Sequence, residues 1–257
     1  MEIDRRGFLK LAGASLAGFV LAGEAYPKEL GKRKDVIYTF DDIPFEMERT
    51  RKHSGILKGN GCRGQFYFTG DAVRVFPDSV DYLISEGFDV GWHSMHHDYM
   101  HKKSEREFSN DIAEWKKALK DASPSYTPRL ARFPYGRGTE RQIKLLEKED
   151  LRLQPCGTRG IDTNNWDVDS MDWSKSECMS YDAIAAKIER INAENPVILF
   201  HLRLGNLFSC RRSDSRQVRL KESYLLRDLD GFEDFIKKAS HGKRVSKVQQ
   251  LQPPLRI

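Results

Sequence analysis

The chain has 257 residues, of which 39% are hydrophobic and 32% are charged, and its formal net charge is +5. This composition is that of an ordinary globular protein, and an aromatic content of 11% argues against disorder throughout the chain. No internal run approaches the roughly 18 apolar residues that a membrane span needs. The modest positive charge suits contact with anionic polymers and equally suits a solvated surface rich in lysine, and no nucleic-acid binding motif is present.

The amino terminus resembles a bacterial twin-arginine export signal. The charged segment Asp4–Lys10, which contains an arginine pair, precedes an apolar run rich in glycine and alanine, Leu11–Gly23. An amphipathic first helix is the alternative interpretation, but the run has no polar face. We therefore expect cleavage after Ala25, export to the periplasm or the cell exterior, and no stable membrane span once residues 1–25 are removed.

From residue 35 onward, short apolar runs alternate with longer amphipathic ones, after a short segment at residues 26–34. The apolar runs suit strands that are buried on both faces of a parallel sheet, and they are Val36–Phe40, Gln65–Thr69, Phe88–Trp92, Arg129–Phe133, Leu151–Pro155, Trp166–Val168 and Val197–Leu202. The helices expected between and after them are Glu46–Lys58, Ser79–Glu86, Ser104–Leu119, Thr139–Glu149, Tyr181–Asn192 and Tyr224–Ala239.

About seven strand–helix units in one domain, residues 35–257, imply parallel strands joined by right-handed crossovers. This pattern allows a barrel or an open doubly wound sheet, and no Gly-x-Gly-x-x-Gly motif follows the first strand to indicate a dinucleotide site. The basic stretch Arg203–Lys221 is expected to be a long surface loop. Four cysteines form no Cys-x-x-Cys pair, so a structural zinc site is not indicated and their disulfide state stays open.

Candidate catalytic and metal-binding residues follow the carboxyl ends of several predicted strands. These are Asp41, Asp42, His93, Arg132, Asp169, Asp172, Trp173 and His201. In parallel α/β folds the active site forms at that edge of the sheet, from the strand ends and the loops after them. Core packing alone does not explain five independent placements at one edge, so we predict an active site there.

The segment His93–His101 indicates a metal site. It offers two histidine pairs at i, i+4 spacing, His93 with His97 and His97 with His101, beside an acidic doublet on a neighbouring strand. Two histidines and one carboxylate with open positions form a common catalytic zinc arrangement. Spacing does not choose between the pairs, but position favours the first, because His93 leaves its strand directly toward the shared edge.

The doublet Asp41-Asp42 suggests different roles for its two carboxylates. Two carboxylates at one site repel each other unless a cation neutralises them, so one would bind the metal and the other would remain free as a base. The alternative is that the doublet caps the helix that follows. Structural alternatives also stand for three other residues: Arg132 as a surface ion-pair partner, and Trp173 and His201 as members of the core.

Five segments together resemble the polysaccharide deacetylases of carbohydrate esterase family 4. They occur in the family's order and are Thr39-Phe40-Asp41-Asp42, His93-Ser94-x-x-His97, Arg132-Phe133-Pro134-Tyr135-Gly136, Asp169-x-x-Asp172-Trp173 and Ile198-x-x-His201. Each motif is weak alone, but five in register are specific, and the resemblance covers nearly all of residues 35–250. Two departures are Ile43 in place of the usual glycine before proline, and Ile198 in place of the usual leucine.

The resemblance implies a distorted (β/α) barrel with a divalent metal at its mouth, Zn²⁺ or another transition metal such as Co²⁺ or Ni²⁺. It implies Asp42, His93 and His97 as the metal ligands and Asp41 as the general base. Arg132 would orient Asp41. Such a metal site suits hydrolysis of an amide, because a Lewis acid polarises the carbonyl group.

The remaining roles implied by the resemblance concern the substrate. The backbone N–H of Tyr135 would help to hold the oxyanion, and Trp173 would form part of the wall around the acetyl methyl group. His201, tuned by Asp172, would be the general acid that protonates the leaving amine. The expected reaction is therefore removal of N-acetyl groups from an extracytoplasmic polysaccharide, such as peptidoglycan or a chitin-like glycan.

Two other functions compete with this interpretation. One is a different C–N hydrolase on the same scaffold, such as an allantoinase-like amidohydrolase, although export argues against a small-molecule pathway of the cytoplasm. The other is a non-catalytic glycan-binding protein, which would need neither Asp41 nor His201. The sequence leaves open the polymer, N- versus O-deacetylation, the native metal and the oligomeric state.

Overall fold

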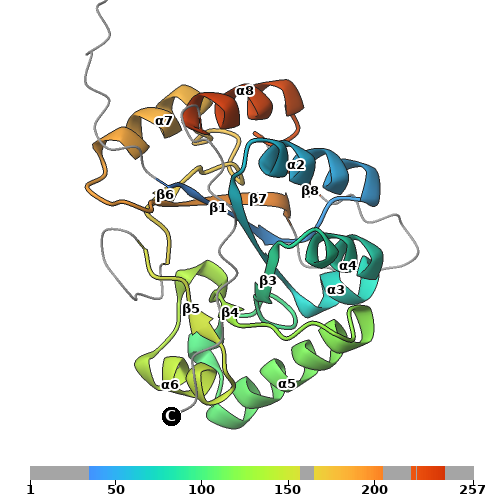
Figure 1. The fold of residues 1–257 in the computed structure, drawn as a ribbon. Helices are drawn as coiled ribbons and strands as arrows, with labels where there is room; N and C mark the ends of the chain where they lie inside the picture. The colour runs from blue at the N-terminus through green and yellow to red at the C-terminus, as the bar shows by residue number, and fades with distance from the viewer. Residues whose placement is uncertain (1–34, 157–164, 205–220, 224, 241–257) are drawn as a thin grey trace, which may run out of the picture. The chain divides into compact units, whose positions relative to one another are not determined.

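The computed structural model describes residues 35–156, 165–204, 221–223 and 225–240 (Figure 1). Residues Lys34–Ile257 make up one compact unit. The expected signal peptide at residues 1–25 and the segment 26–34 lie outside the described residues, as does Cys210. Cys62, Cys156 and Cys178 are free cysteines.

The sheet has the strand order β5-β4-β3-β2-β1-β7-β6, and every neighbouring pair in it is parallel. The bounds are β1 Ile37–Asp42, β2 Arg63–Phe68, β3 Asp89–Trp92, β4 Leu130–Ala131, β5 Arg152–Leu153, β6 Val168–Asp169 and β7 Val197–Leu204. Strands β1 to β5 follow one another across the sheet, and β7 returns to the other side of β1, which is the order of a barrel and not of a doubly wound sheet. No ladder joins β5 to β6 among the described strands, so the barrel is open there. The predicted distorted barrel of about seven strands is confirmed.

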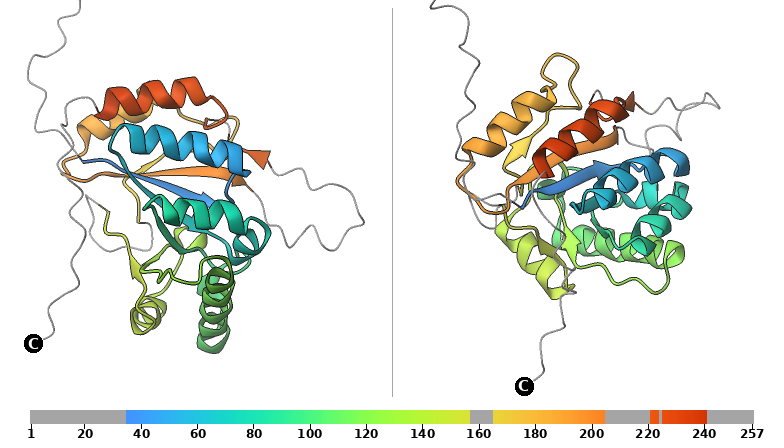
Figure 2. Two further views of the ribbon diagram at one scale, coloured as in Figure 1. Left: turned by 45° about the vertical axis from the view of Figure 1, so that its right-hand side comes forward. Right: turned by 45° about the horizontal axis from the view of Figure 1, so that its top comes forward.

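Helices cover the outer side of the sheet and pack against one another in turn. Helix α7 packs on α8, α8 on α2, α2 on α4, α4 on α5, and α5 on α6 (Figure 2). Their bounds are α2 Met47–Gly59, α3 Gly70–Val75, α4 Pro77–Ser85, α5 Glu105–Ala122, α6 Glu140–Lys148, α7 Tyr181–Arg190 and α8 Leu229–Ser240. Two 3₁₀ turns, η1 Met100–Lys102 and η2 Pro134–Gly136, are also present.

Two of the predicted segments depart clearly from the structure. Helix α8 begins at Leu229 and not at Tyr224, because the hydroxyl of Ser223 accepts the N–H groups of Leu225 and Leu226 and holds a turn there. The stretch predicted as a loop over Arg203–Lys221 has strand at both ends, since β7 continues to Leu204 and pairs antiparallel with β8, Lys221–Glu222. Residues 205–220 lie outside the described part.

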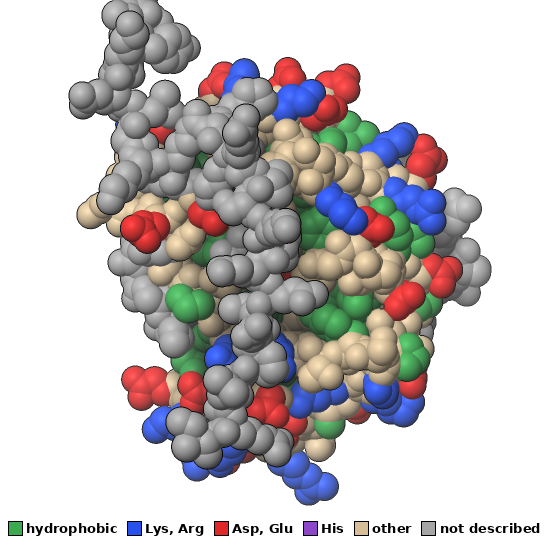
Figure 3. All heavy atoms as spheres, viewed as in Figure 1, with side chains coloured by type: hydrophobic (Ala, Val, Ile, Leu, Met, Phe, Trp, Pro, Cys, Tyr) green, Lys and Arg blue, Asp and Glu red, His purple; other side chains and the backbone are tan. Residues whose placement is uncertain are grey.

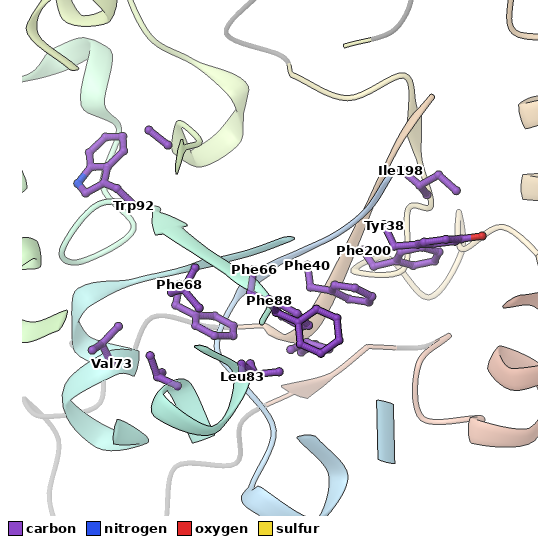
Figure 4. Close-up of a cluster of buried hydrophobic side chains, with 14 of the residues drawn as sticks. Tyr38, Phe40, Phe66, Phe68, Val73, Leu83, Phe88, Trp92, Ile198 and Phe200 are labelled. Carbon is purple, nitrogen blue, oxygen red and sulfur yellow. The ribbon is translucent and has the colours of Figure 1, made fainter. Parts of the chain in front are cut away.

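The outward face of the central strands is aromatic (Figure 4). Phe40 of β1 lies in register with Phe66 of β2 and Phe200 of β7, and its ring centroid is 4.9 Å and 5.8 Å from theirs. Phe232 of α8 packs edge-on against Phe40 from the helix layer. Because strand side chains alternate, this arrangement leaves Thr39 and Asp41 to the inner side of the curled sheet, where polar groups gather.

On the face of the molecule shown in Figure 3, basic and acidic side chains are interspersed. This distribution matches the interpretation of the positive net charge as a solvated surface more than as one basic patch. None of the described helices combines the length and the apolar run that crossing a membrane requires.

Candidate active site

A change of register brings both carboxylates of the acidic doublet to the same edge of the sheet. Asp41 pairs with His201 across the β1–β7 ladder, but Asp42 pairs with Arg203, so the register slips by one residue between them. Asp42 also has a left-handed backbone, with φ of 73°. Such an irregularity re-aims a side chain at the end of a strand. Helix α2 begins after Glu46 and takes no side-chain cap from the doublet, so the capping alternative is wrong.

Asp42, His93 and His97 converge at this edge. His93 Nε2 lies 3.4 Å and His97 Nε2 lies 3.1 Å from Asp42 Oδ1. One potential ligand atom from each of the three residues lies within 4.8 Å of the others. His101 sits in η1 and is not in this group, which is the only such cluster in the described part of the chain. The structure thus brings together the histidine pair that strand position favoured.

The loop that carries the histidines is held in an unusual conformation. Ser94 and His97 both have left-handed backbones, with φ of 62° and 58°, and the Ser94 hydroxyl accepts the His97 N–H at 2.8 Å. Asp111 of α5 accepts the Met95 N–H at 2.9 Å and the Trp92 indole N–H at 2.9 Å. Burial raises the pKa of Asp111 to about 6. These contacts fix the loop from the helix side.

The three residues fit a bound cation. Asp42 Oδ1 is buried and accepts no well-aligned hydrogen bond from any described residue, although two imidazoles point at it. Burial raises the pKa of Asp42, but the charge of His97 and the close imidazoles of both histidines outweigh it, so the pKa is lowered. An ionised carboxylate with two imidazole nitrogens is a donor set that divalent transition metals prefer.

Arg132 is fully buried and holds Asp41. Its Nη1 donates to Asp41 Oδ1 at 2.8 Å and to the Thr39 hydroxyl at 2.7 Å. Its other nitrogens donate to Asn165, with Nε to the side-chain oxygen at 3.3 Å and Nη2 to the backbone carbonyl at 3.1 Å. The alternative of a surface ion pair is therefore wrong. One oxygen of Asp41 is tethered, and Oδ2 stands 3.7 Å from His93 Nε2.

Three residues of this arrangement were not among the predicted site residues. Thr39 and Asn165 accept from Arg132, and Tyr67 places its ring 4.3 Å below the guanidinium carbon. Thr39 and Tyr67 occupy inward positions of β1 and β2, so strand alternation offers a signal for both. Asn165 lies in irregular chain before β6, and nothing in its sequence context marks it.

His201 lies on β7 and is paired with Asp172. Its Nδ1 donates to Asp172 Oδ1 at 2.8 Å, and its backbone N–H donates to Asp172 Oδ2 at 2.9 Å. The Ser223 hydroxyl also donates to Oδ2, at 2.6 Å. Burial lowers the pKa of His201, but the charge and hydrogen bond of Asp172 dominate and raise it to about 10. The imidazole is therefore protonated near neutral pH, with Nε2 left free of Asp172.

Tyr135 and Trp173 are the exposed members of the predicted set. The side chain of Tyr135 lies in η2, and its backbone has φ of 60°, so this bulky residue occupies a strained region. The Tyr135 N–H donates to no acceptor among the described residues, since the turn uses the N–H groups that follow it. Trp173 is 41% exposed, so the alternative of a core tryptophan is wrong.

Comparisons with known proteins agree with this geometry. The polysaccharide deacetylase family model matches residues 28–153. The chain is 28% identical over 169 residues to a peptidoglycan-N-acetylglucosamine deacetylase of Bacillus cereus, covering 66% of this chain and 56% of that protein. It is 26% identical over 205 residues to a chitooligosaccharide deacetylase of Bradyrhizobium, covering 78% and 87%.

A solved structure shares the fold. The crystal structure of a peptidoglycan N-acetylglucosamine deacetylase in complex with a hydroxamate-type benzamide superposes with a TM-score of 0.60 at 24% identity, covering 81% of this chain and 82% of that one. This likeness supports the barrel architecture. The chain spans just over half the length of the Bacillus relative that it matches.

Proposed function

Because this chain belongs to the polysaccharide deacetylase family, we propose that it hydrolyses the N-acetyl amides of an extracytoplasmic polysaccharide, releasing acetate and a free amine. The names of the relatives point to peptidoglycan or to a chitin-like glycan as the polymer. The sequence supports the compartment through the arginine pair Arg5-Arg6 and the apolar run that follows.

Asp42, His93 and His97 would hold one divalent metal ion, and we propose Zn²⁺. When bound, this ion supplies a Lewis acid that polarises the acetyl carbonyl and makes a water molecule more acidic. The support is the buried, unsatisfied Asp42 Oδ1 between two imidazoles. Both histidines have Nδ1 engaged elsewhere, by Arg132 O and by the Tyr135 hydroxyl, so each presents Nε2 to the site.

Asp41 acts as the general base in this proposal. Arg132 occupies Oδ1, so Oδ2 is the atom that takes the proton from the attacking water. The guanidinium is locked in turn by Thr39 and Asn165, and the carboxylate therefore has one orientation. A fixed carboxylate avoids reorganisation during the reaction.

Tyr135 acts on the carbonyl oxygen of the amide, and His201 acts on its nitrogen. The Tyr135 N–H is free to donate to the oxygen as it gains negative charge. His201 Nε2 donates its proton to the departing nitrogen, because Nδ1 is occupied by Asp172. Water thus loses one proton to Asp41, and the amine gains one from His201, so the reaction balances.

One observation carries the proposal most strongly: Asp41 and His201 are partners across one ladder, beside the Asp42–His93–His97 cluster. The test is acetate release from N-acetylated peptidoglycan and chito-oligosaccharides, with and without chelator. We expect release that chelator abolishes and added Zn²⁺ restores. Acetate release that persists in chelator would overturn the metal role, and no release from any acetylated glycan would overturn the function.

A further inference from the structure

The two histidines of the Asp42–His93–His97 cluster are held by different kinds of hydrogen bond at Nδ1. His93 is 2% exposed and its Nδ1 donates to a backbone carbonyl, that of Arg132, at 2.9 Å. The side chain of His97 is 18% exposed, and its Nδ1 lies 3.2 Å from the hydroxyl of Tyr135. No substitution at Arg132 removes the first acceptor, whereas one substitution at Tyr135 removes the second.

His97 needs such a contact more than His93 does. His93 follows β3 directly and inherits its direction from the sheet, but His97 has a left-handed backbone within the loop between β3 and η1. Its N–H is bound by Ser94, which fixes the main chain and leaves the imidazole to rotate about its own torsions. The ring contacts Tyr135 edge to face, with centroids 4.6 Å apart.

Tyr135 is itself supported by a second tyrosine. Its ring stacks on that of Tyr99, with centroids 4.2 Å apart and planes 16° from parallel. Tyr99 directly precedes η1, two residues after His97, so the stack ties the histidine loop to η2. Tyr135 is 47% exposed and Tyr99 is 44% exposed, so the stack lies at the protein surface beside His97.

We propose that the hydroxyl of Tyr135, supported by the ring of Tyr99, is the positioning group for His97 as a metal ligand. This inference rests on the proposed metal site and adds a side-chain role to a residue whose backbone N–H serves the oxyanion. With Nε2 as the ligand atom, Nδ1 carries the proton and donates it to the tyrosine oxygen, which fixes the ring plane. Loss of such an outer partner typically weakens metal binding by about 10–100-fold.

The experiment measures the dissociation constant of Zn²⁺ from the apoprotein by competition with a chromophoric chelator. Tyr135→Phe keeps the ring and the stack but removes the hydroxyl, and we expect binding weaker by about tenfold or more. Tyr99→Phe is the matched control, because it removes a hydroxyl and keeps the stack, and its affinity should equal that of the parent protein. Thermal unfolding in excess chelator should be unchanged in both variants.

Tyr99→Ala adds a test of the support. It should weaken Zn²⁺ binding in the parent background and have little further effect in the Tyr135→Phe background, because the hydroxyl that it positions is then absent. Parent-like affinity in Tyr135→Phe, or equal losses from Tyr99→Ala in both backgrounds, would overturn the inference. A parent protein that binds Zn²⁺ without releasing acetate would overturn the proposed function alone, and one that binds no Zn²⁺ would overturn both.

Discussion

Asp41 faces His201 as its direct partner across the β1–β7 ladder, and each of the two is held by its own outer residue. Arg132 fixes Asp41 Oδ1, while Asp172 fixes His201 Nδ1. The proposed general base is thus held by a cation, and the proposed general acid beside it is held by an anion. Each side chain of the pair therefore has a partner of opposite charge, Arg132 for Asp41 and Asp172 for His201.

Exchanging Asp41 for Asn should separate the base from the metal site. Asp41→Asn keeps an oxygen for Arg132, so the fold and the bound metal should persist, while kcat falls by about 10²–10⁴-fold. Metal analysis and acetate release measure the two quantities on one sample. The matched change, Asp42→Asn, should lose the metal as well. Equal metal loss in the two variants would contradict the division of roles.

The metal content of histidine variants should show which histidines bind the ion. His93→Ala and His97→Ala should each strip the protein of its divalent ion, because each removes one of the three proposed ligands. His101→Ala is the control from the same segment and should leave about one ion per chain. A protein emptied by His101→Ala and still loaded after His93→Ala would reverse the assignment.

The buried Arg132 should matter for stability as well as for activity. Arg132→Met leaves the Asp41 carboxylate buried without its partner, and such a loss typically costs about 3–5 kcal/mol of unfolding free energy. Urea unfolding in excess chelator measures this quantity without a contribution from metal binding. The exposed Arg137 offers a control, and Arg137→Met should stay within about 0.5 kcal/mol. A small loss from Arg132→Met would mean that the Asp41 charge is neutralised elsewhere.

A comparison of an amide substrate with an activated acetate ester should show whether His201 is the general acid. An amide needs a proton on its poor amine leaving group, whereas an activated acetate ester does not, so His201→Ala should depress amide hydrolysis by about 10²–10⁴-fold and largely spare the ester. Metal content should not change. If both substrates slow by the same factor, His201 does not protonate the leaving group.

The pH profile should report the Asp172–His201 pair. The pKa of His201 is raised to about 10, so the acid is protonated below that value and activity falls as pH rises through it. Asp172→Asn removes the carboxylate that raises this pKa, and the alkaline limb should move to lower pH. An alkaline limb that stays in place would mean that another group controls it. Rates measured across pH with a chito-oligosaccharide decide this.

Export can be tested apart from catalysis. Residues 1–30 fused to a reporter that folds in the cytoplasm should carry it out of the cell's interior, and changing Arg5 and Arg6 together to Lys should retain it. Cell fractionation measures the outcome. Unaffected export of the double variant would point to the general secretory route.

The strands and the convergence of Asp42, His93 and His97 could be predicted from the sequence, because each depends on local pattern. Apolar runs predicted every strand of the barrel order, and the polar residues at their ends predicted which side chains would meet. Two features were not accessible. The register slip at Asp42 depends on how β7 pairs with β1, which is a contact between residues about 160 apart in the chain. Helix α3, Gly70–Val75, is too short to show an amphipathic period.

Asn165 illustrates the same limit at the site. It clamps Arg132 from irregular chain, so neither strand alternation nor a helical period marks it. The alternative roles for Arg132 and Trp173 were equally undecidable before their exposures were known. Burial depends on the assembled fold, and a single residue type carries little information about it.

The tetrapeptide Arg132–Tyr135 contacts three separate parts of the site. Its first carbonyl binds His93, its guanidinium binds Asp41, and its last hydroxyl binds His97. The three contacts therefore depend on one short segment, and an insertion, a deletion or a shift within residues 132–135 would disturb all of them together. Sequence variation that spares these contacts is open instead to exposed positions that make none of them, such as Trp173.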